Sequence, residues 1–143
     1  MINALKHFKR TVIVLSAVAS IGTMAFMAPL AWAATCTQGV WSSGTSGRCV
    51  SDIQTMLNIE GNYIRWANWS SLSTDGQFGP LTKGQVRAFQ TYTSIQQDGI
   101  VGPQTWGKLC DKAIDVITGL NDRGSFKTAD ALQVTANDAG CGI

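Results

Sequence analysis

Few residues of this 143-residue chain are suited to acid–base or metal chemistry. Glu60 is the sole glutamate, and Asp75 is the partner with which it could hydrolyse a glycosidic bond without histidine. Asp75, however, stands in an Asp-Gly turn and already has a conformational role. The single histidine, His7, lies in a segment that we expect to be removed. We therefore expect no Ser-His-Asp or Cys-His catalysis, no metal site, no cofactor, and a protein that is not an enzyme.

The four cysteines have the spacing of disulfides rather than of a zinc site. They are separated by 12, 60 and 30 intervening residues, and no short C-x-x-C pair occurs. An even number of cysteines in a small exported chain predicts two disulfides, for which three pairings exist. The four residues are Cys36, Cys49, Cys110 and Cys141.

Residues 1–33 have the pattern of a secretory signal peptide. A basic start precedes the uncharged apolar run 11–30, and Ala-Trp-Ala at 31–33 forms a small-x-small cleavage box. Two alternatives stay open. The run of about 20 apolar residues could remain as a membrane anchor, or Cys36 could carry a lipid, although the residues before it lack the leucine of a lipid-attachment box. Export is expected in each case.

Removal of the signal peptide reverses the sign of the net charge. Three of the 11 Lys and Arg residues lie in 1–33 and none of the 9 Asp and Glu residues does, so the expected mature chain, 34–143, carries eight basic and nine acidic groups. A net charge of −1 removes the electrostatic footprint that nucleic-acid binding requires. We expect no nucleic-acid partner and no stable membrane insertion after cleavage.

An eight-residue pattern occurs twice in the expected mature chain. The segments 75–82 and 98–105 share D-G-x-h-G-P-x-T, in which h is apolar. Asp-Gly predicts a turn with glycine at positive φ, the apolar residue points inward, and Gly-Pro begins a helix with proline at its first position. Each copy is therefore expected to be a turn that leads into a helix.

Apolar spacing predicts three short helices around these turns. They run from about Arg48 to Asn58, over about 80–93 with Leu81, Ala88 and Phe89 facing the core, and from Pro103 to Cys110. Phe78, Phe89 and Trp106 are expected core residues. Beyond Cys110, the pattern predicts a helix over 112–120 and a second one capped by Thr128 and ended by Gly140. The fold class is thus all-α, a small three-helix bundle with a short helical extension.

Disulfides are expected to hold this small bundle together. Cys49 begins the first predicted helix and Cys110 ends the third, so their pairing would join the ends of the bundle. Cys36 and Cys141 would then join the two tails.

Four segments together resemble a known family. They are 47–57 (GRCVSDIQTML), the first repeat, 86–90 (VRAFQ), and the second repeat with the helix that follows it. The segment 44–110 is similar to a complete type-1 peptidoglycan-binding domain, as found in secreted cell-wall hydrolases and zinc carboxypeptidases. The resemblance implies a three-helix domain that holds an enzyme on murein. We divide the chain into a signal peptide (1–33), an N-terminal lead-in (34–43), this domain (44–110) and a C-terminal helical tail (111–143).

Binding of murein would require aromatic faces for sugar rings and polar groups for hydroxyl, acetamido and carboxylate groups. Trp66 and Trp69 are expected either to stack on sugar or to close over the bundle, and Asp75 favours a turn role over ligand contact. The candidate ligand-binding residues are Tyr63, Arg65, Trp66, Trp69, Asp75, Gln77, Gln90 and Tyr92.

The resemblance leads to one expected function and one alternative. We expect a secreted, cell-wall-associated, noncatalytic monomer that binds bacterial peptidoglycan. The segment 111–143 contains no histidine, no cysteine-nucleophile motif and no carboxylate pair. The alternative is an exported protein-interaction module that regulates or tethers a cell-wall hydrolase in trans.

Overall fold

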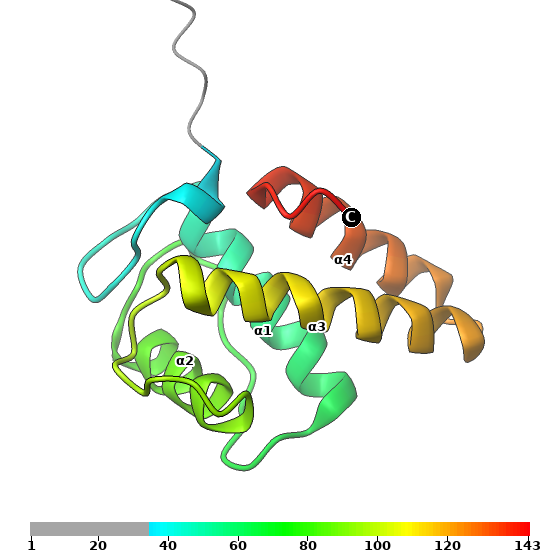
Figure 1. Ribbon diagram of the computed structural model, residues 1–143, viewed down its shortest axis with the longest axis horizontal. Helices are drawn as coiled ribbons and strands as arrows, with labels where there is room; N and C mark the ends of the chain where they lie inside the picture. Colours follow the sequence, from blue (N-terminus) through cyan, green and yellow to red (C-terminus); the bar gives the residue numbers. More distant parts are fainter. Residues whose placement is uncertain (1–34) are drawn as a thin grey trace, which may run out of the picture. The chain divides into compact units, whose positions relative to one another are not determined.

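The computed structural model describes residues 35–143, and the predicted signal peptide lies outside them (Figure 1). Within this range the chain is helical, as expected, and its only extended pairing is two isolated bridges. None of the described helices combines the length and the apolar character needed to cross a bilayer. The elements are η1 (Cys36–Gln38), α1 (Arg48–Ile64), α2 (Pro80–Tyr92), α3 (Pro103–Asp122) and α4 (Phe126–Ala139).

Helices α2 and α3 begin as the repeated pattern predicts. Proline occupies the start of each helix, and Gly79 and Gly102 are the N-cap residues with extended backbone. Helix α2 ends one residue before the predicted limit. Helix α3, in contrast, runs unbroken through the two helices predicted at 103–110 and 112–120, and the predicted boundary at residue 110 falls inside it. Its continuous buried stripe explains this length: Trp106, Leu109, Ala113, Val116 and Leu120.

Helix α1 continues past its predicted end at Asn58 to Ile64. Glu60 and Gly61 still face the interior, so the buried stripe extends into the last turn. The helix ends at Arg65, which adopts the left-handed conformation (φ 58°, ψ 53°) and donates its N–H to the Gly61 carbonyl at 2.8 Å. The connection from α1 to α2, which carries Trp66 and Trp69, therefore begins at residue 65.

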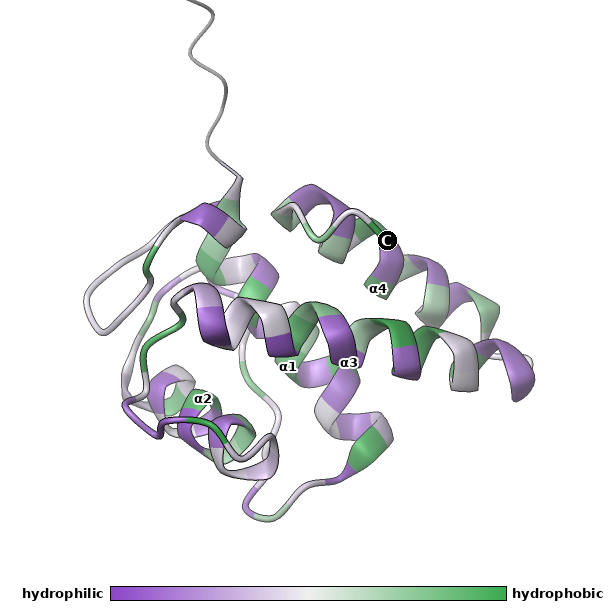
Figure 2. Ribbon diagram, viewed as in Figure 1, coloured by the Kyte–Doolittle hydropathy of each residue, from purple (hydrophilic) through white to green (hydrophobic). Residues whose placement is uncertain are grey.

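The core confirms three of the predicted buried residues and contradicts one. Phe78, Phe89 and Trp106 are at most 2% exposed, whereas Leu81 is 77% exposed. The prediction for Leu81 was wrong because the inward stripe of α2 passes through Thr82, Val86 and Phe89. Figure 2 shows hydrophobic and hydrophilic residues alternating along each helix, as amphipathic packing requires.

Helix α4 belongs to the core of this bundle. It packs against both α1 and α3, and four of its residues are fully buried: Ala129, Leu132, Ala136 and Ala139. The helix begins at Phe126, so the prediction that Thr128 caps it was wrong, and Ser125 stands at the N-cap. Gly140 ends the helix at φ 103°, as predicted.

All four cysteines form disulfides, but the predicted pairing was wrong. Cys36 bonds to Cys49 and Cys110 bonds to Cys141, with Cα–Cα distances of 5.3 and 5.4 Å. Because α3 runs well past Cys110, this residue does not lie at a helix end. Helix α4 then returns along α3 and brings Cys141 to it (Figure 1).

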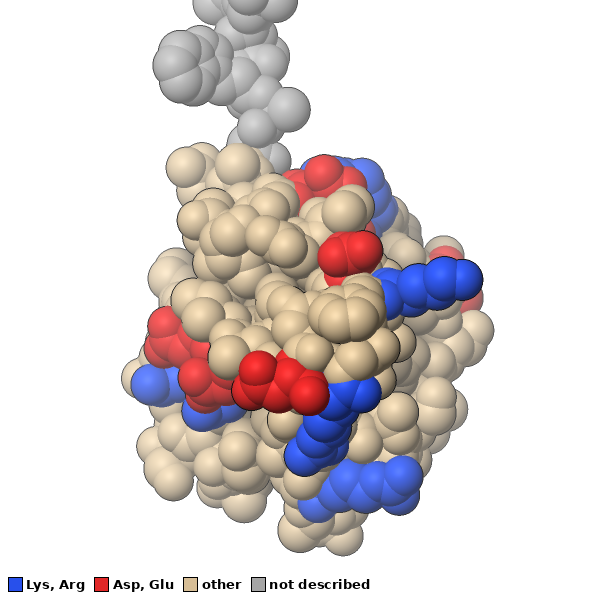
Figure 3. All heavy atoms as spheres, turned by 90° about the vertical axis from the view of Figure 1, so that its right-hand side faces the viewer, with Lys and Arg blue, Asp and Glu red and all other residues tan. Residues whose placement is uncertain are grey.

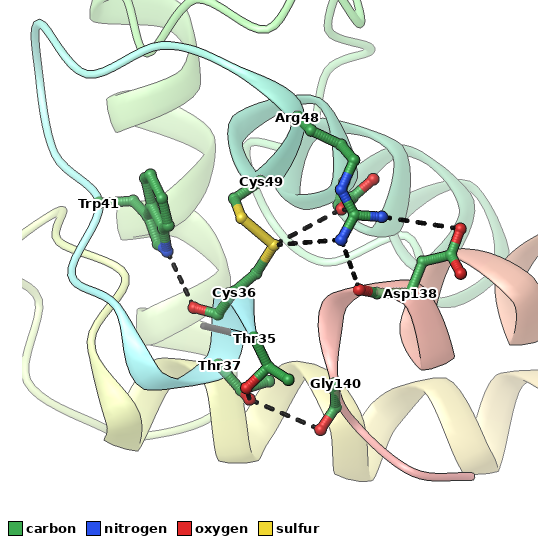
Figure 4. The surroundings of a disulfide bond; sticks show 9 residues. Thr35, Cys36, Thr37, Trp41, Arg48, Cys49, Asp138 and Gly140 are labelled. Carbon is green, nitrogen blue, oxygen red and sulfur yellow. Dashed lines mark hydrogen bonds and ion pairs between the residues drawn. A yellow bond between two sulfur atoms is a disulfide. The ribbon is translucent and has the colours of Figure 1, made fainter. Parts of the chain in front are cut away.

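The segment before α1 is fixed to both turns. Trp41 and Val101 exchange backbone hydrogen bonds at 3.0 and 2.8 Å, and Phe78 donates its N–H to the Thr45 carbonyl at 3.0 Å. The Trp41 indole also donates to the Cys36 carbonyl beside the first disulfide (Figure 4). The Ser/Gly-rich stretch 42–47 is turn-rich, and its backbone is hydrogen-bonded to the bundle.

Candidate functional site

The first repeated turn is organised by a glutamine from α1. The Gln54 side-chain nitrogen lies 2.9 Å from Asp75 Oδ1, 3.0 Å from the Gln77 carbonyl and 3.1 Å from Thr82 Oγ1. The Gln54 side-chain oxygen accepts the Gly76 N–H at 2.9 Å. One buried amide therefore connects both ends of the turn to helix α1.

The second turn repeats this arrangement with a glutamine from α2. The Gln90 side-chain nitrogen lies 2.8 Å from Asp98 Oδ1, 2.9 Å from the Ile100 carbonyl and 3.1 Å from Thr105 Oγ1. Its oxygen accepts the Gly99 N–H at 2.9 Å. Gln90 is therefore buried and fully used within the fold, and the structure contradicts its predicted contact with a ligand.

Both turn aspartates are held in the ionised form. The Gln77 N–H and then the Gln54 amide lower the pKa of Asp75, and the Ile100 N–H is the largest cause of the lowered pKa of Asp98. In each case Oδ1 takes these bonds. Among residues 35–143, Asp75 Oδ2 has no hydrogen-bond partner, and Asp75 is exposed. A charged acceptor is thus available at the first turn.

Two hollows adjoin the first turn, and Asp75 and Gln77 line both. We refer to them as the paired hollows. The larger has a volume of 350 Å³ and is lined by Ser46, Gly47, Arg48, Ser51, Thr74, Asp75, Gly76 and Gln77. The smaller has a volume of 150 Å³ and is lined by Gln54, Leu72, Ser73, Asp75, Gln77, Gly79, Pro80, Leu81 and Thr82.

The paired hollows offer neutral polar groups and one free negative charge. Hydroxyl groups and the exposed Gln77 amide line the larger hollow, and Leu81 gives the smaller one an exposed apolar wall. The cation at the rim, Arg48, is already engaged: it donates to the Asp138 carbonyl at 2.7 Å and faces the Asp52 and Asp138 carboxylates (Figure 4). This chemistry suits hydroxyl, amide and acetamido groups better than an anion.

Trp66 and Trp69 pack into the fold. Trp66 is 6% exposed, meets Phe89 edge to face at 5.5 Å and stacks on Tyr92 at 5.8 Å. Trp69 is half-buried and lies so close to Gly61 that a Cβ there would clash with its indole. Of the two expected roles, the structure favours closing over the bundle, and Tyr92 is the most exposed of these three residues.

The remaining two predicted residues, Tyr63 and Arg65, line a different hollow near the end of α1. The eight predicted residues therefore do not form one site. Asp75 and Gln77 line the paired hollows, Trp66 and Tyr92 stack together, Trp69 covers Gly61, and Gln90 is inside.

Sequence reasoning missed Gln54, Ser46, Ser51 and Thr74. Gln54 precedes Asp75 by 21 residues whereas Gln90 precedes Asp98 by 8, so the glutamines do not share the constant offset that revealed the repeat. Ser46 lies in the Ser/Gly-rich stretch before α1, and Ser51 lies in α1 itself. A glutamine on the apolar stripe of α1 was the one available signal.

The carboxylate pair considered for catalysis does not form. Glu60 is 0% exposed, and both of its oxygens are buried without a hydrogen-bond partner in the described chain. Burial raises its pKa well above the ordinary value, with a smaller opposing effect from Lys112. Asp75 is at the surface with a lowered pKa. The two carboxylates therefore face different environments and cannot act together on one substrate.

Comparison with known protein families agrees with the two-turn architecture. Residues 46–109 match the family described as "Putative peptidoglycan binding domain". This segment is thus similar to peptidoglycan-binding domains. The match includes both turns and ends inside α3, so that α4 lies beyond it.

Individual relatives match parts of the chain. The zinc D-Ala-D-Ala carboxypeptidase of Streptomyces albus G is 37% identical over 87 residues, which are 58% of this chain and 31% of that protein. An "Uncharacterized protein in bpoA1 3'region" of Kitasatospora aureofaciens is 60% identical over 35 residues, 24% of this chain and 30% of that protein. The matches thus span about a third of each relative.

A crystal structure of a peptidoglycan-binding protein from Clostridioides difficile, in complex with glutamine hydroxamate, also matches. It is 37% identical, with a TM-score of 0.44, and the match covers 51% of this chain and 41% of that one.

Proposed function

We propose that this chain is a secreted, noncatalytic module that binds bacterial cell-wall peptidoglycan at the paired hollows. The proposal rests on where the lining residues of the paired hollows lie in the sequence. Every residue that lines either hollow falls within 46–109, the segment that matches the peptidoglycan-binding family. The hollow lined by Tyr63 and Arg65, by comparison, uses residues beyond that segment.

The groups in the paired hollows complement a glycan with attached peptides. Asp75 Oδ2 accepts a hydrogen bond from a sugar hydroxyl or an amide N–H, and the Gln77 amide both donates and accepts. The exposed Leu81 side chain contacts an acetamido methyl group or a sugar C–H face. The Gln54 network holds the turn before ligand arrives, which reduces the entropy lost on binding.

The absence of catalysis is supported by the surroundings of the carboxylates. Glu60, the only glutamate, has no exposed oxygen, and Asp75 is kept ionised by its hydrogen bonds. No residue near Asp75 in the paired hollows can provide the second carboxyl group of a glycosidase. A module of this kind would retain a protein on the wall without cleaving it.

Secretion to the cell wall and a monomeric state complete the proposal. The signal-peptide pattern in 1–33 supports export, and the two disulfides suit an oxidising compartment. A cell-wall hydrolase acting in trans remains a proposed partner.

Co-sedimentation with purified sacculi tests this function. We expect the folded protein to sediment and soluble murein fragments to compete. Gln77→Ala and Leu81→Ala should each weaken retention severalfold without lowering the Tm, because both side chains are exposed. Val134→Ala is the matched control, since Val134 is 60% exposed on α4 away from the hollows.

Two outcomes would count against the proposal. Folded, oxidised protein that fails to sediment with every type of sacculus excludes wall binding. Capture of a cell-wall hydrolase by protein that ignores sacculi would instead support the protein-interaction alternative.

A further inference from the structure

A further polar hollow, distinct from the paired hollows, lies where three helices meet. We call it the arginine hollow. It has a volume of 310 Å³. The end of α1, the end of α3 and the start of α4 form it, so it depends on the helix that lies outside the family segment. Its lining residues are Ile59, Asn62, Tyr63, Arg65, Leu120, Arg123, Ser125 and Thr128.

The two guanidinium groups of the arginine hollow have no hydrogen-bond or ion-pair partner in the described part of the chain. Within residues 35–143, neither Arg65 nor Arg123 forms an ion pair or a side-chain hydrogen bond, whereas Arg48, Lys108 and Lys112 each face an aspartate. Figure 3 faces the end of the molecule where α3 turns into α4 and shows acidic and basic side chains next to one another at several places on this face. The donor N–H groups of both arginines thus remain to be satisfied by water or by a ligand.

The position of Arg123 is fixed by an aromatic ring. Its Cζ atom lies 4.4 Å from the centroid of the Tyr63 ring, a cation–π contact. Tyr63 is held in turn by Gly119, where a Cβ would clash with the Tyr63 hydroxyl. Arg123 also covers one face of Tyr63, so stacking of that face on a sugar is excluded.

Helix ends alone do not account for this arrangement. A cation near the carboxyl end of a helix is favourable, and Arg65 and Arg123 are the C-cap residues of α1 and α3. That effect acts at each helix separately. It does not require both arginines to line one hollow together with an amide and two hydroxyl groups.

We propose that the arginine hollow binds the free carboxylate of a short peptide, specifically the stem peptide of peptidoglycan. This rests on the proposed function. A planar guanidinium matches a carboxylate in a bidentate manner. The Asn62 amide and the Ser125 and Thr128 hydroxyl groups suit the adjoining peptide amide, and Ile59 and Leu120 provide apolar wall for a small side chain.

A phosphate-rich polymer fits this surface less well than a carboxylate. The described part of the chain carries eight basic and nine acidic groups, so as a whole it does not attract a polyanion. Selectivity must therefore come from the two arginines that line this hollow.

NMR titration of the purified, disulfide-bonded chain with N-acetyl-D-Ala-D-Ala tests the inference. We expect saturable shifts of the Asn62 and Thr128 amides and of the Arg65 and Arg123 side-chain Nε–H signals. Arg65→Gln and Arg123→Gln should each weaken binding at least tenfold. Arg87→Gln is the matched control, because Arg87 is an exposed cation on α2 that lines neither this hollow nor the paired hollows.

Two further ligands test whether the hollow recognises a carboxylate: N-acetyl-D-Ala-D-Ala with its C-terminus amidated, and inorganic phosphate. Binding of the amide with equal affinity, binding of phosphate alone, or equal losses in Arg87→Gln would each overturn the carboxylate site. Retained dispersion of the spectra shows that each variant is folded. If sacculi still retain the protein while the probe does not bind, only this inference fails; if sacculi do not retain it, the proposed function fails.

Discussion

Gln54 in α1 and Gln90 in α2 make equivalent contacts with the two copies of the repeated turn. Each side-chain nitrogen faces an aspartate Oδ1, a turn carbonyl and a threonine hydroxyl, and each oxygen accepts a glycine N–H at 2.9 Å. The two turns therefore share a set of hydrogen bonds as well as a sequence pattern. These bonds make the first turn a rigid support for the paired hollows.

Replacement of either glutamine by leucine should destabilise the fold strongly. Gln54→Leu leaves the buried Gly76 N–H without a partner, and Gln90→Leu does the same at Gly99. Each orphaned buried group costs about 1 to 3 kcal/mol, so we expect a loss of about 2 kcal/mol or more per variant in urea unfolding. Gln133→Leu, at an exposed helical position, is the control. Equal midpoints for all three variants would show that these networks add nothing.

Replacement of glycine by alanine should destabilise the fold at the two turns and stabilise it within a helix. Gly76 and Gly99 have φ of 69° and 73°, which alanine adopts at a cost of about 1 kcal/mol or more. A Cβ at Gly76 would also lie 3.1 Å from the Gly47 carbonyl oxygen. Gly84→Ala in α2 has open space around its Cβ and should stabilise by up to about 1 kcal/mol. Thermal unfolding measures all three, and stabilisation by Gly76→Ala would contradict the observed turn.

The sequence predicted the parts of this fold that depend on local chemistry. Asp-Gly and Gly-Pro determine φ within a few residues, so both turns, the starts of α2 and α3 and the end of α4 at Gly140 were predictable. Disulfide pairing depends on the path of the whole chain. The return of α4 along α3 brings Cys141 to Cys110, and no local pattern encodes that return.

The candidate site was predictable only where the repeat contains it. Asp75 and Gln77 are motif residues and line the paired hollows. Trp66 and Gln90 carry groups that bind sugars equally well, but here Trp66 packs against Phe89 and Gln90 hydrogen-bonds the second turn. Composition cannot distinguish an aromatic ring on a surface from one under a neighbouring tyrosine. Arg123 was not considered because its partner in the arginine hollow, Tyr63, belongs to α1, far earlier in the chain.

Stability should fall as pH rises from acid to neutral, and Glu60 should be the cause. Its pKa is raised in the folded state by burial, so its contribution is fully favourable below its ordinary pKa of 4.5 and is lost as pH rises through the folded pKa. Urea unfolding between pH 4.5 and 7.5 should show this decline. In Glu60→Gln, which cannot ionise, the decline should flatten.

Asp75 and Asp98 should act in the opposite direction at lower pH. Their pKa values are lowered in the folded state, so the stability they contribute is present above the ordinary value of 3.8 and is lost as pH falls through the folded pKa. The Glu60 prediction has a clear contrary outcome. If the free energy of unfolding of Glu60→Gln declined as steeply as that of the parent chain between pH 4.5 and 7.5, a group other than Glu60 would govern this pH dependence.

Removal of the Cys110–Cys141 disulfide should release α4 and, with it, one wall of the arginine hollow. The bond closes a loop with a sequence separation of 31, for which the chain-entropy model gives about 3 to 4 kcal/mol. We expect Cys110→Ala/Cys141→Ala to lose that much in urea unfolding and to weaken binding of N-acetyl-D-Ala-D-Ala while sacculi still retain the folded fraction. Cys36→Ala/Cys49→Ala is the comparison, because that disulfide joins the lead-in to α1 and neither cysteine lines the arginine hollow. Peptide mapping without reduction should first recover the two linkages of the structure, Cys36 with Cys49 and Cys110 with Cys141. A fragment that joins Cys49 to Cys110 would contradict the observed return of α4, because Cys110 cannot bond to both cysteines.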